Sequence, residues 1–415
     1  MFNKLLERAG VWFVLPLIMV MFSAEVLAHG ERAQLASMRM RTMHWFDFQV
    51  SATTVKVGDT VTMRGTFSPS EHWPEQLPHI SDTGFLNVGV PGPAFIRIDS
   101  SVNGVPMIRS TAFHPGKVYE YEVVLRARLP GRYHLHPLIN VKDAGTLVGK
   151  GAWLEVEALD GDQPFVNNAE TMLGDVINLE THGLQNIINW HLVWIVMGVA
   201  WLAFWLIRKQ LFIPRFILVR HLKEEANSLI TKKDFMVAGV FFAVTLGIIL
   251  GGYLWAENKY PITIPLQTGK VVVEAPDIPT GGLDINVDSA QYKLAGRSLT
   301  MNTTMTNNSD SPLHLAEFLT ANIRFFNADA GMSTAYKDEE MVSTDGLTAS
   351  IDVIAPGQTV KVKLVAEDAL WEKFRMTGMI HDPDSRFAGV LFYYDDQGNR
   401  FFQELGGPIL PRFFD

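Results

Sequence analysis

The sequence of 415 residues contains no cysteine. A disulfide framework, a thiolate metal site and a cysteine nucleophile are therefore excluded. Acidic residues outnumber basic ones by 44 to 35, which gives a formal net charge of −9. Nucleic acid is therefore not an expected partner, because proteins that bind it carry a basic face. Charged residues make up 19% of the chain and hydrophobic residues 47%. That composition excludes a disordered chain and allows a sizeable core.

The first 28 residues are typical of a secretory signal. Lys4 and Arg8 form a basic start, an apolar run covers residues 11–22, and Ala28 supplies the small residue required for cleavage. Cleavage after residue 28 makes His29 the first residue of the mature chain. The alternative is an uncleaved anchor, although this apolar run is shorter than the roughly 20 residues that a membrane-spanning helix needs.

Two longer apolar runs, residues 187–207 and 235–254, predict transmembrane helices with aromatic residues near the membrane interface. The loop between them, residues 208–234, has seven basic and three acidic side chains, a net charge of +4. The positive-inside rule places this loop in the cytoplasm. We therefore expect a protein of a bacterial inner or intracytoplasmic membrane whose remaining parts lie on the periplasmic or lumenal side.

Residues 29–180 and 265–415 predict two β-sandwich domains, so the expected fold class is mainly β. In the first region, residues 118–128 alternate between apolar and polar side chains, as a half-buried strand does. Pro-Gly and Asn-Gly dipeptides mark turns in this region, and similar turn signals occur in the second. Short strands at this spacing indicate sandwiches or barrels.

The two β regions share sequence features that indicate an internal duplication. Residues 58–63 parallel residues 296–301 with an offset of 238, and residues 114–125 parallel residues 355–366 with an offset of 241. The alternative is that a strand, a turn and a strand recur in any sandwich. The second region contains only two histidines, His314 and His381, so a histidine site is expected in the first region alone.

A His-x-His pattern, His134 and His136, is the strongest metal-binding candidate. Alternate residues of a strand point to one face, roughly 6.5–7 Å apart, so both imidazoles can bind one ion. A terminal His29 would add its ring nitrogen and an α-amine whose pKa of about 7.7–8.0 permits deprotonation near neutral pH. Nitrogen ligands without sulfur favour copper, with zinc and nickel as alternatives. The structural alternative is a pair of ordinary surface or core histidines.

His44 and His72 are weaker candidates, for a second metal site. His44 follows a methionine-rich segment, and His72 lies in a predicted loop. A loop histidine is most often simply solvated. Neither residue belongs to a motif with metal-ligand spacing such as the His-x-His pattern.

Similarity to a known family occurs in residues 29–34, 38–47, 85–93, 131–141, 259–269 and 382–389. These segments resemble the B subunit of copper membrane monooxygenases, the family that includes particulate methane monooxygenase and ammonia monooxygenase. The order of signal, sandwich, two helices and sandwich also resembles that subunit, and the resemblance covers nearly the whole chain.

The resemblance implies cupredoxin-like sandwiches and copper held by His29, His134 and His136. It also implies assembly with two membrane subunits, A and C, as a trimer of heterotrimers. Some members have a second site built from a histidine pair. His44 matches one half of that pair, but Ser68 stands at the other, and His72 would have to replace it.

The reaction that this resemblance implies is insertion of one oxygen atom from O₂ into methane or ammonia, with a quinol-type reductant. Residues 91–93 and 260–267 resemble methane or short-alkane members, whereas residues 140–145 and 151–153 resemble ammonia members. We expect hydroxylation of methane or short alkanes, with oxidation of ammonia to hydroxylamine as the alternative, and the catalytic centre can lie in a partner subunit. The alternative of another class is a non-enzymatic periplasmic copper carrier or scaffold.

Overall fold

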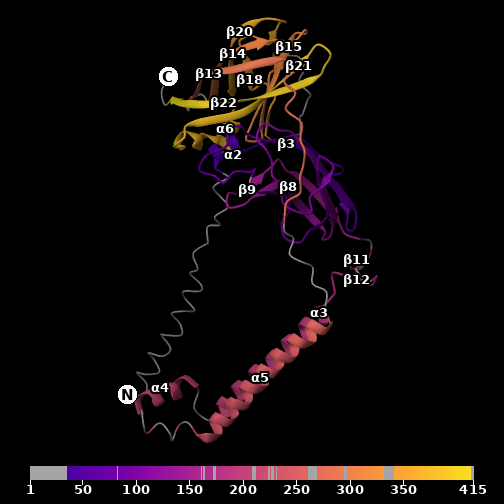
Figure 1. The fold of residues 1–415 in the computed structure, drawn as a ribbon, viewed down its shortest axis with the longest axis vertical. Coiled ribbons are helices and arrows are strands. Elements are labelled where there is room, and N and C mark those ends of the chain that lie inside the picture. The colour runs from indigo at the N-terminus through magenta and orange to yellow at the C-terminus, as the bar shows by residue number, and fades with distance from the viewer. Residues whose placement is uncertain are drawn as a thin grey trace. The chain divides into compact units, whose positions relative to one another are not determined.

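The computed structural model describes residues 35–81, 83–159, 161, 164–171, 174–207, 212–222, 225, 229, 231–259, 269–293, 297–330 and 341–412. It divides into two units, residues 1–163 with 268–415, and residues 164–267. The first unit holds most of the strands and the second holds two long helices (Figure 1). The prediction of a mainly β fold with two β domains and two apolar helices is confirmed.

The part of the first unit before residue 163 contains two sheets. The short helix α2 (Ala36–Thr42) leads directly into β1. Val61 and Met63 of one sheet and Leu135 and Ile139 of the other are fully buried, which places the core on the apolar faces of both sheets. One sheet has the order β1 (Met43–Val50), β3 (Thr60–Pro69), β7 (Tyr119–Ala127), β5 (Phe95–Val102), β6 (Val105–Pro106). The other has the order β2 (Thr54–Lys56), β10 (Ala152–Glu157), β8 (Gly131–Val141), β4 (Gly84–Gly89), with β9 (Gly145–Val148) paired to β8.

The part of the first unit after residue 268 is built on one ten-stranded sheet that encloses its own core. Buried side chains such as Leu299, Phe318, Leu364 and Trp371 belong to a single hydrophobic cluster. The shorter elements of this part are η3 (Ala328–Ala330), α6 (Leu370–Lys373) and η4 (Met376–His381). The strand order is β17 (Val342–Ser343), β16 (Ile323–Phe326), β15 (Leu313–Thr320), β21 (Arg386–Asp395), β22 (Arg400–Arg412), β13 (Leu283–Lys293), β14 (Ser298–Asn307), β20 (Thr359–Glu367), β18 (Leu347–Ala349), with β19 (Val353–Ile354) on β15.

Strand pairing supports the predicted duplication. β3 pairs antiparallel with β7, and β14 pairs antiparallel with β20. Val61 lies opposite Leu125 in the first pair, and the offsets of 238 and 241 carry these residues onto Leu299 and Ala366, which lie opposite each other in the second pair. The register is therefore the same in both copies, which a chance recurrence of strands and turns does not require.

Helix α2 and strand β1 connect the two β parts. Met40 of α2 lies in the hydrophobic cluster of the C-terminal part. The buried Arg41 side chain donates to Asp382 at 3.3 Å and to Asp384 at 2.6 Å, in the turn after η4. Phe46 of β1 packs with Phe392 and Phe402. An ordered N-terminal segment is thus joined to the second β part by apolar and charged contacts together.

The second unit is a helical hairpin. Helix α3 (Leu184–Ile207) and helix α5 (Lys232–Lys259) are both long and apolar enough to cross a membrane, with mean hydropathies of 1.8 and 2.3 in their most apolar parts. Trp201 stacks near Phe241 with ring centroids 4.7 Å apart, and Trp190 lies against Gly252, so the two helices pack antiparallel. The other elements of this unit are β11 (Asn168–Glu170), β12 (Val176–Asn178) and α4 (Phe212–Leu222).

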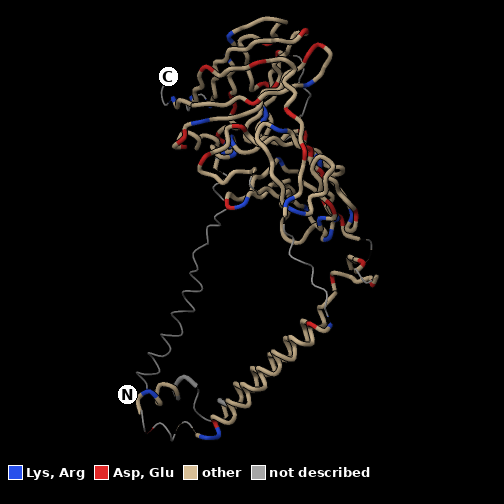
Figure 2. The backbone as a smooth tube through the Cα atoms, in the orientation of Figure 1, with Lys and Arg blue, Asp and Glu red and all other residues tan. Residues whose placement is uncertain are grey.

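Both helices extend beyond the predicted apolar runs, because a helical backbone continues through the polar residues at a membrane boundary. Figure 2 shows almost no charged residues along the middle of the hairpin. The hairpin therefore has the length and composition of two membrane spans, and the predicted basic loop includes the helix α4.

Candidate metal centre

Strand β8 presents His134 and His136 on one face. Leu135 and Ile139 point into the core and are fully buried, whereas the two histidines are half-buried. This alternation arises from the two-residue period of a strand. The sequence prediction that both imidazoles share a face is therefore met by the structure.

The two imidazoles face each other through specific nitrogens. His136 Nε2 lies 2.9 Å from His134 Nδ1, and the ring centroids are 4.3 Å apart with the rings nearly perpendicular. His136 Nδ1 lies 2.9 Å from the carbonyl oxygen of Gly149. Because a carbonyl only accepts, Nδ1 carries the proton and Nε2 keeps a lone pair directed at His134. This is the tautomer that a metal ligand needs.

Gly149, Gly151 and Trp153 form the wall beside the histidines. Gly149 and Gly151 lie in the segment that leads into β10, and Trp153 is the second residue of that strand, opposite His134. A Cβ atom at Gly151 would lie 2.6 Å from Cε1 and Nδ1 of His136, so only glycine leaves room for that ring. The Trp153 indole stacks on His134 with ring centroids 4.6 Å apart.

This donor set fits copper. Two nitrogens bound about 2.0 Å from one ion and about 90° apart lie roughly 2.8 Å from each other, and the observed separation of His134 Nδ1 and His136 Nε2 is 2.9 Å. In the described part of the chain, no group of three or more His, Asp or Glu side chains is arranged to hold an ion. Further ligands would have to come from elsewhere, and the predicted ligand His29 lies outside the described residues.

His44 and His72, the predicted second site, lie near a carboxylate that the sequence did not indicate. His44 Nε2 is 3.0 Å from Glu404 Oε1, and both side chains are buried. Ser70 also donates to Glu404, as does the backbone amide of Glu71 at 2.7 Å. His72 packs against Gly406, two residues from this carboxylate. Ser68 lies directly opposite His44 in the pairing of β1 with β3.

Burial, charge and hydrogen bonding shift the pKa values of Glu404 and His72 in this second cluster. Burial alone would raise the pKa of Glu404, but the charge and hydrogen bond of His44, with the donors at Ser70 and Glu71, lower it. Burial lowers the pKa of His72. Glu404 is therefore ionised near neutral pH and accepts hydrogen bonds from His44, Ser70 and Glu71. Sequence reasoning missed it because it is 360 residues from His44, and no local spacing joins β22 to β1.

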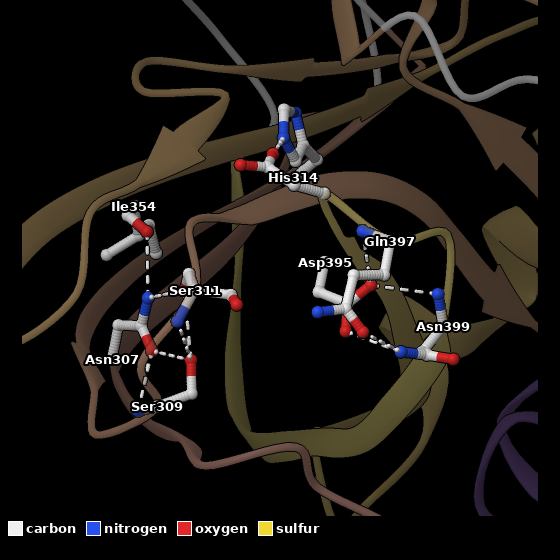
Figure 3. Close-up of polar contacts among 9 residues, drawn as sticks. Asn307, Ser309, Ser311, His314, Ile354, Asp395, Gln397 and Asn399 are labelled. Atoms are coloured by element: carbon white, nitrogen blue, oxygen red, sulfur yellow. Dashed lines mark hydrogen bonds and ion pairs between the residues drawn. The ribbon is translucent and has the colours of Figure 1, made fainter.

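One of the two histidines of the second copy, His314 near the start of β15, contacts a polar turn. His314 Nε2 lies 2.7 Å from Asp396 Oδ1. Figure 3 shows this end of the C-terminal β part, where Asn307 donates to the carbonyls of Ser311 and Ile354 at 2.9 Å each and the Asp395 carboxylate accepts from the turn after it. Polar groups of these turns satisfy one another, so the ring of His314 serves as part of a turn network.

Comparison with known proteins identifies the family of this chain. The sequence profile of the monooxygenase B-subunit protein matches residues 30–413. The chain is 39% identical over 414 residues to the particulate methane monooxygenase alpha subunit of Methylococcus capsulatus (strain Bath), an alignment that covers 98% of this chain and 99% of that relative. The chain therefore belongs to the family of monooxygenase B subunits and is part of a multi-subunit monooxygenase.

Two solved structures show weaker likeness. The cupredoxin domain of amoB from Nitrosocaldus yellowstonii is 16% identical, with a TM-score of 0.23, and the match covers 32% of this chain and 97% of that chain. Domains 4 and 5 of the S-layer protein SbsC are also 16% identical, with a TM-score of 0.15, and the match covers 28% of this chain and 54% of that chain. At these TM-scores the likeness defines neither fold nor function.

Proposed function

We propose that the chain is the copper-binding B subunit of a membrane monooxygenase that hydroxylates methane or short alkanes with O₂ and a quinol-type reductant. The observation that carries this proposal is the facing pair of imidazole nitrogens, 2.9 Å apart, in a chain of the monooxygenase B-subunit family. The name of the relative from Methylococcus capsulatus favours methane over ammonia. A copper carrier that acts alone is less consistent with membership of a family of enzyme subunits.

In this proposal His134 Nδ1 and His136 Nε2 hold copper together with the amine and ring of His29. Bound copper would supply one-electron redox chemistry. The chain supplies a partner for His136, since the carbonyl of Gly149 keeps a proton on Nδ1, and a gap at Gly151 that admits the ring.

The proposal includes how the mature subunit is placed. The signal of residues 1–28 is removed, residues 29–180 and 265–415 form cupredoxin-like domains on the periplasmic or lumenal side, and residues 208–234 lie in the cytoplasm. The helical hairpin binds the A and C subunits in a trimer of heterotrimers. A small apolar substrate reaches the complex through the bilayer, into which it partitions.

The test uses the complex isolated from its native membrane. N-terminal sequencing, copper content and electron paramagnetic resonance (EPR) are compared for wild type, a His134→Ala/His136→Ala variant and the control His314→Ala, whose ring is paired with Asp396. We expect a terminus at His29, two co-purifying membrane subunits, and a nitrogen-coordinated Cu(II) signal that only the double variant loses. Turnover of methane and ammonia is assayed side by side. Retention of Met1, or an unchanged signal in the double variant, would contradict the proposal.

A further inference from the structure

The two proposed copper ligands, His134 and His136, differ in the contacts that orient their rings. His136 has a backbone partner, because its Nδ1 lies 2.9 Å from the carbonyl of Gly149. The hydrogen bond shown for His134 is the one to His136 itself. Metal-binding histidines almost always donate their second N–H to a carbonyl or carboxylate, which orients the ring. Some other contact must therefore set the plane of the His134 ring.

That contact is an aromatic stack across two strands. Trp153 of β10 lies directly opposite His134 of β8, so both side chains stand on the same face. Their ring centroids are 4.6 Å apart and the planes differ by 28°. The Arg132 guanidinium lies 4.7 Å from the centroid of the Trp153 ring, and Arg132 shares the face of His134 because it is two residues earlier on the same strand.

Trp153 makes this stack at the surface of the sheet. Its side chain is 46% exposed, whereas the next residue, Leu154, is fully buried in the core. Core packing therefore does not require an indole at position 153. Its ring contacts include those with His134 and Arg132. An Arg side chain favours the face of an electron-rich indole, which limits the rotation of both groups.

We propose that Trp153, held by Arg132, is a positioning residue that fixes the plane of the His134 imidazole so that Nδ1 meets His136 Nε2. The stack replaces the hydrogen bond that His134 lacks to a backbone group or a carboxylate in the described part of the chain. Free rotation of this ring about its Cβ–Cγ bond would turn Nδ1 away from the ion. The inference rests on the proposed copper site.

The test compares Trp153→Ala, Trp153→Phe and Arg132→Gln in the isolated complex, with Ile98→Ala as a matched control. Ile98 is an apolar side chain, 47% exposed, on the other sheet of the same sandwich. Each complex is stripped of copper and titrated with Cu(II) against a competing chelator, and its EPR spectrum is recorded. Spectra of a His134→Ala/His136→Ala complex are subtracted to remove copper held by other subunits.

We expect Trp153→Ala to lower the Cu(II) affinity of this site about tenfold, since loss of a ring-orienting group costs about 10–100-fold in metal affinity. Its Cu(II) hyperfine splitting should change. Trp153→Phe should have a Cu(II) affinity and a hyperfine splitting near those of wild type. Arg132→Gln should give values between those of wild type and Trp153→Ala. Ile98→Ala should match wild type.

Two results would overturn the inference, and they are distinguishable. If Trp153→Ala keeps the affinity and spectrum of wild type while the double histidine variant loses the signal, the copper site stands and the stack has no positioning role. If wild type and the double histidine variant have the same copper content and spectrum, the copper site itself is wrong and the inference falls with it.

Discussion

Two backbone positions, Gly149 and Gly151, decide how the ring of His136 lies. The carbonyl of Gly149 selects its tautomer, and the missing side chain of Gly151 leaves the space that the ring occupies. Neither glycine has chemistry of its own. The geometry of the proposed metal site therefore depends on two glycines that are not themselves metal ligands.

Substitution Gly151→Ala should displace the His136 ring, because the new Cβ would lie 2.6 Å from Cε1 and Nδ1. We expect at least a tenfold loss of Cu(II) affinity in the isolated complex, with assembly unchanged. The control is Gly378→Ala, since a Cβ at Gly378 meets nothing within 4 Å. Equal copper affinity in the two variants would contradict the geometry described for this ring.

The buried Glu404 connects strand β22 to His44 on β1, and its lowered pKa makes the pair sensitive to acid. A carboxyl group whose pKa is lower in the folded state contributes stability that is present above its unfolded value, about 4.3, and is lost as the pH falls through the folded value. The His44 charge and hydrogen bonds produce that lowering against the effect of burial.

Substitution Glu404→Gln should therefore remove about 2 kcal/mol at neutral pH, where the charged hydrogen bonds operate, and much less below about pH 4. We would measure thermal unfolding of the complex from about pH 3.5 to 7 and expect the two curves to converge at the acid end. Glu122→Gln serves as control, because Glu122 pairs with Arg64 at an exposed position. A difference that stays constant across this pH range would refute the ionised state of Glu404.

The duplicated element is a strand pair with a preserved register. β3 with β7 and β14 with β20 place equivalent residues opposite each other. The copies diverge after the second strand of the pair. Three residues separate β7 from β8, whereas α6 and η4 lie between β20 and β21. The short turn in the first copy leads straight into β8, the strand that carries His134 and His136, so the proposed metal site lies in the first copy alone.

Helix α2 is held on the C-terminal β part by the buried ion pair of Arg41 with Asp382. Substitution Arg41→Ala should cost about 3–5 kcal/mol, because it leaves a buried carboxylate without its partner. Urea unfolding of the complex, followed by tryptophan fluorescence, measures this cost. Arg64→Ala removes an exposed ion pair and should cost under about 1 kcal/mol. Similar shifts for both variants would mean that the α2 contact is no stronger than a surface pair.

The whole molecule combines a β unit and an apolar hairpin, and the proposed topology puts the β unit and the basic loop on opposite sides of the membrane. Because the chain has no cysteine, single introduced cysteines give an unambiguous report. In intact spheroplasts, a membrane-impermeant maleimide should label Asp310→Cys, in an exposed turn of the C-terminal β part, and should leave Lys233→Cys unlabelled. After permeabilisation both should react. The reverse pattern would invert the topology.

Local periodicity and composition were enough to predict many elements of this chain. The sequence predicted two apolar runs of membrane length, alternating strands and the His-x-His pattern. These predictions were possible because side chains in a strand repeat every two residues and a membrane span requires about 20 apolar residues. The resemblance to a monooxygenase subunit also came from short local segments, and the family match over residues 30–413 confirms it.

Which distant groups meet depended on packing. Glu404 reaches His44 because β22 lies beside β1, and Trp153 reaches His134 because β10 pairs with β8 in one particular register. Arg41 contacts Asp382 across 341 positions of the chain. Contacts of this kind depend on how strands and helices pack. No periodicity in the sequence relates residues that lie so far apart along the chain. Local order could therefore be read along the chain, while the surroundings of each histidine came from the fold.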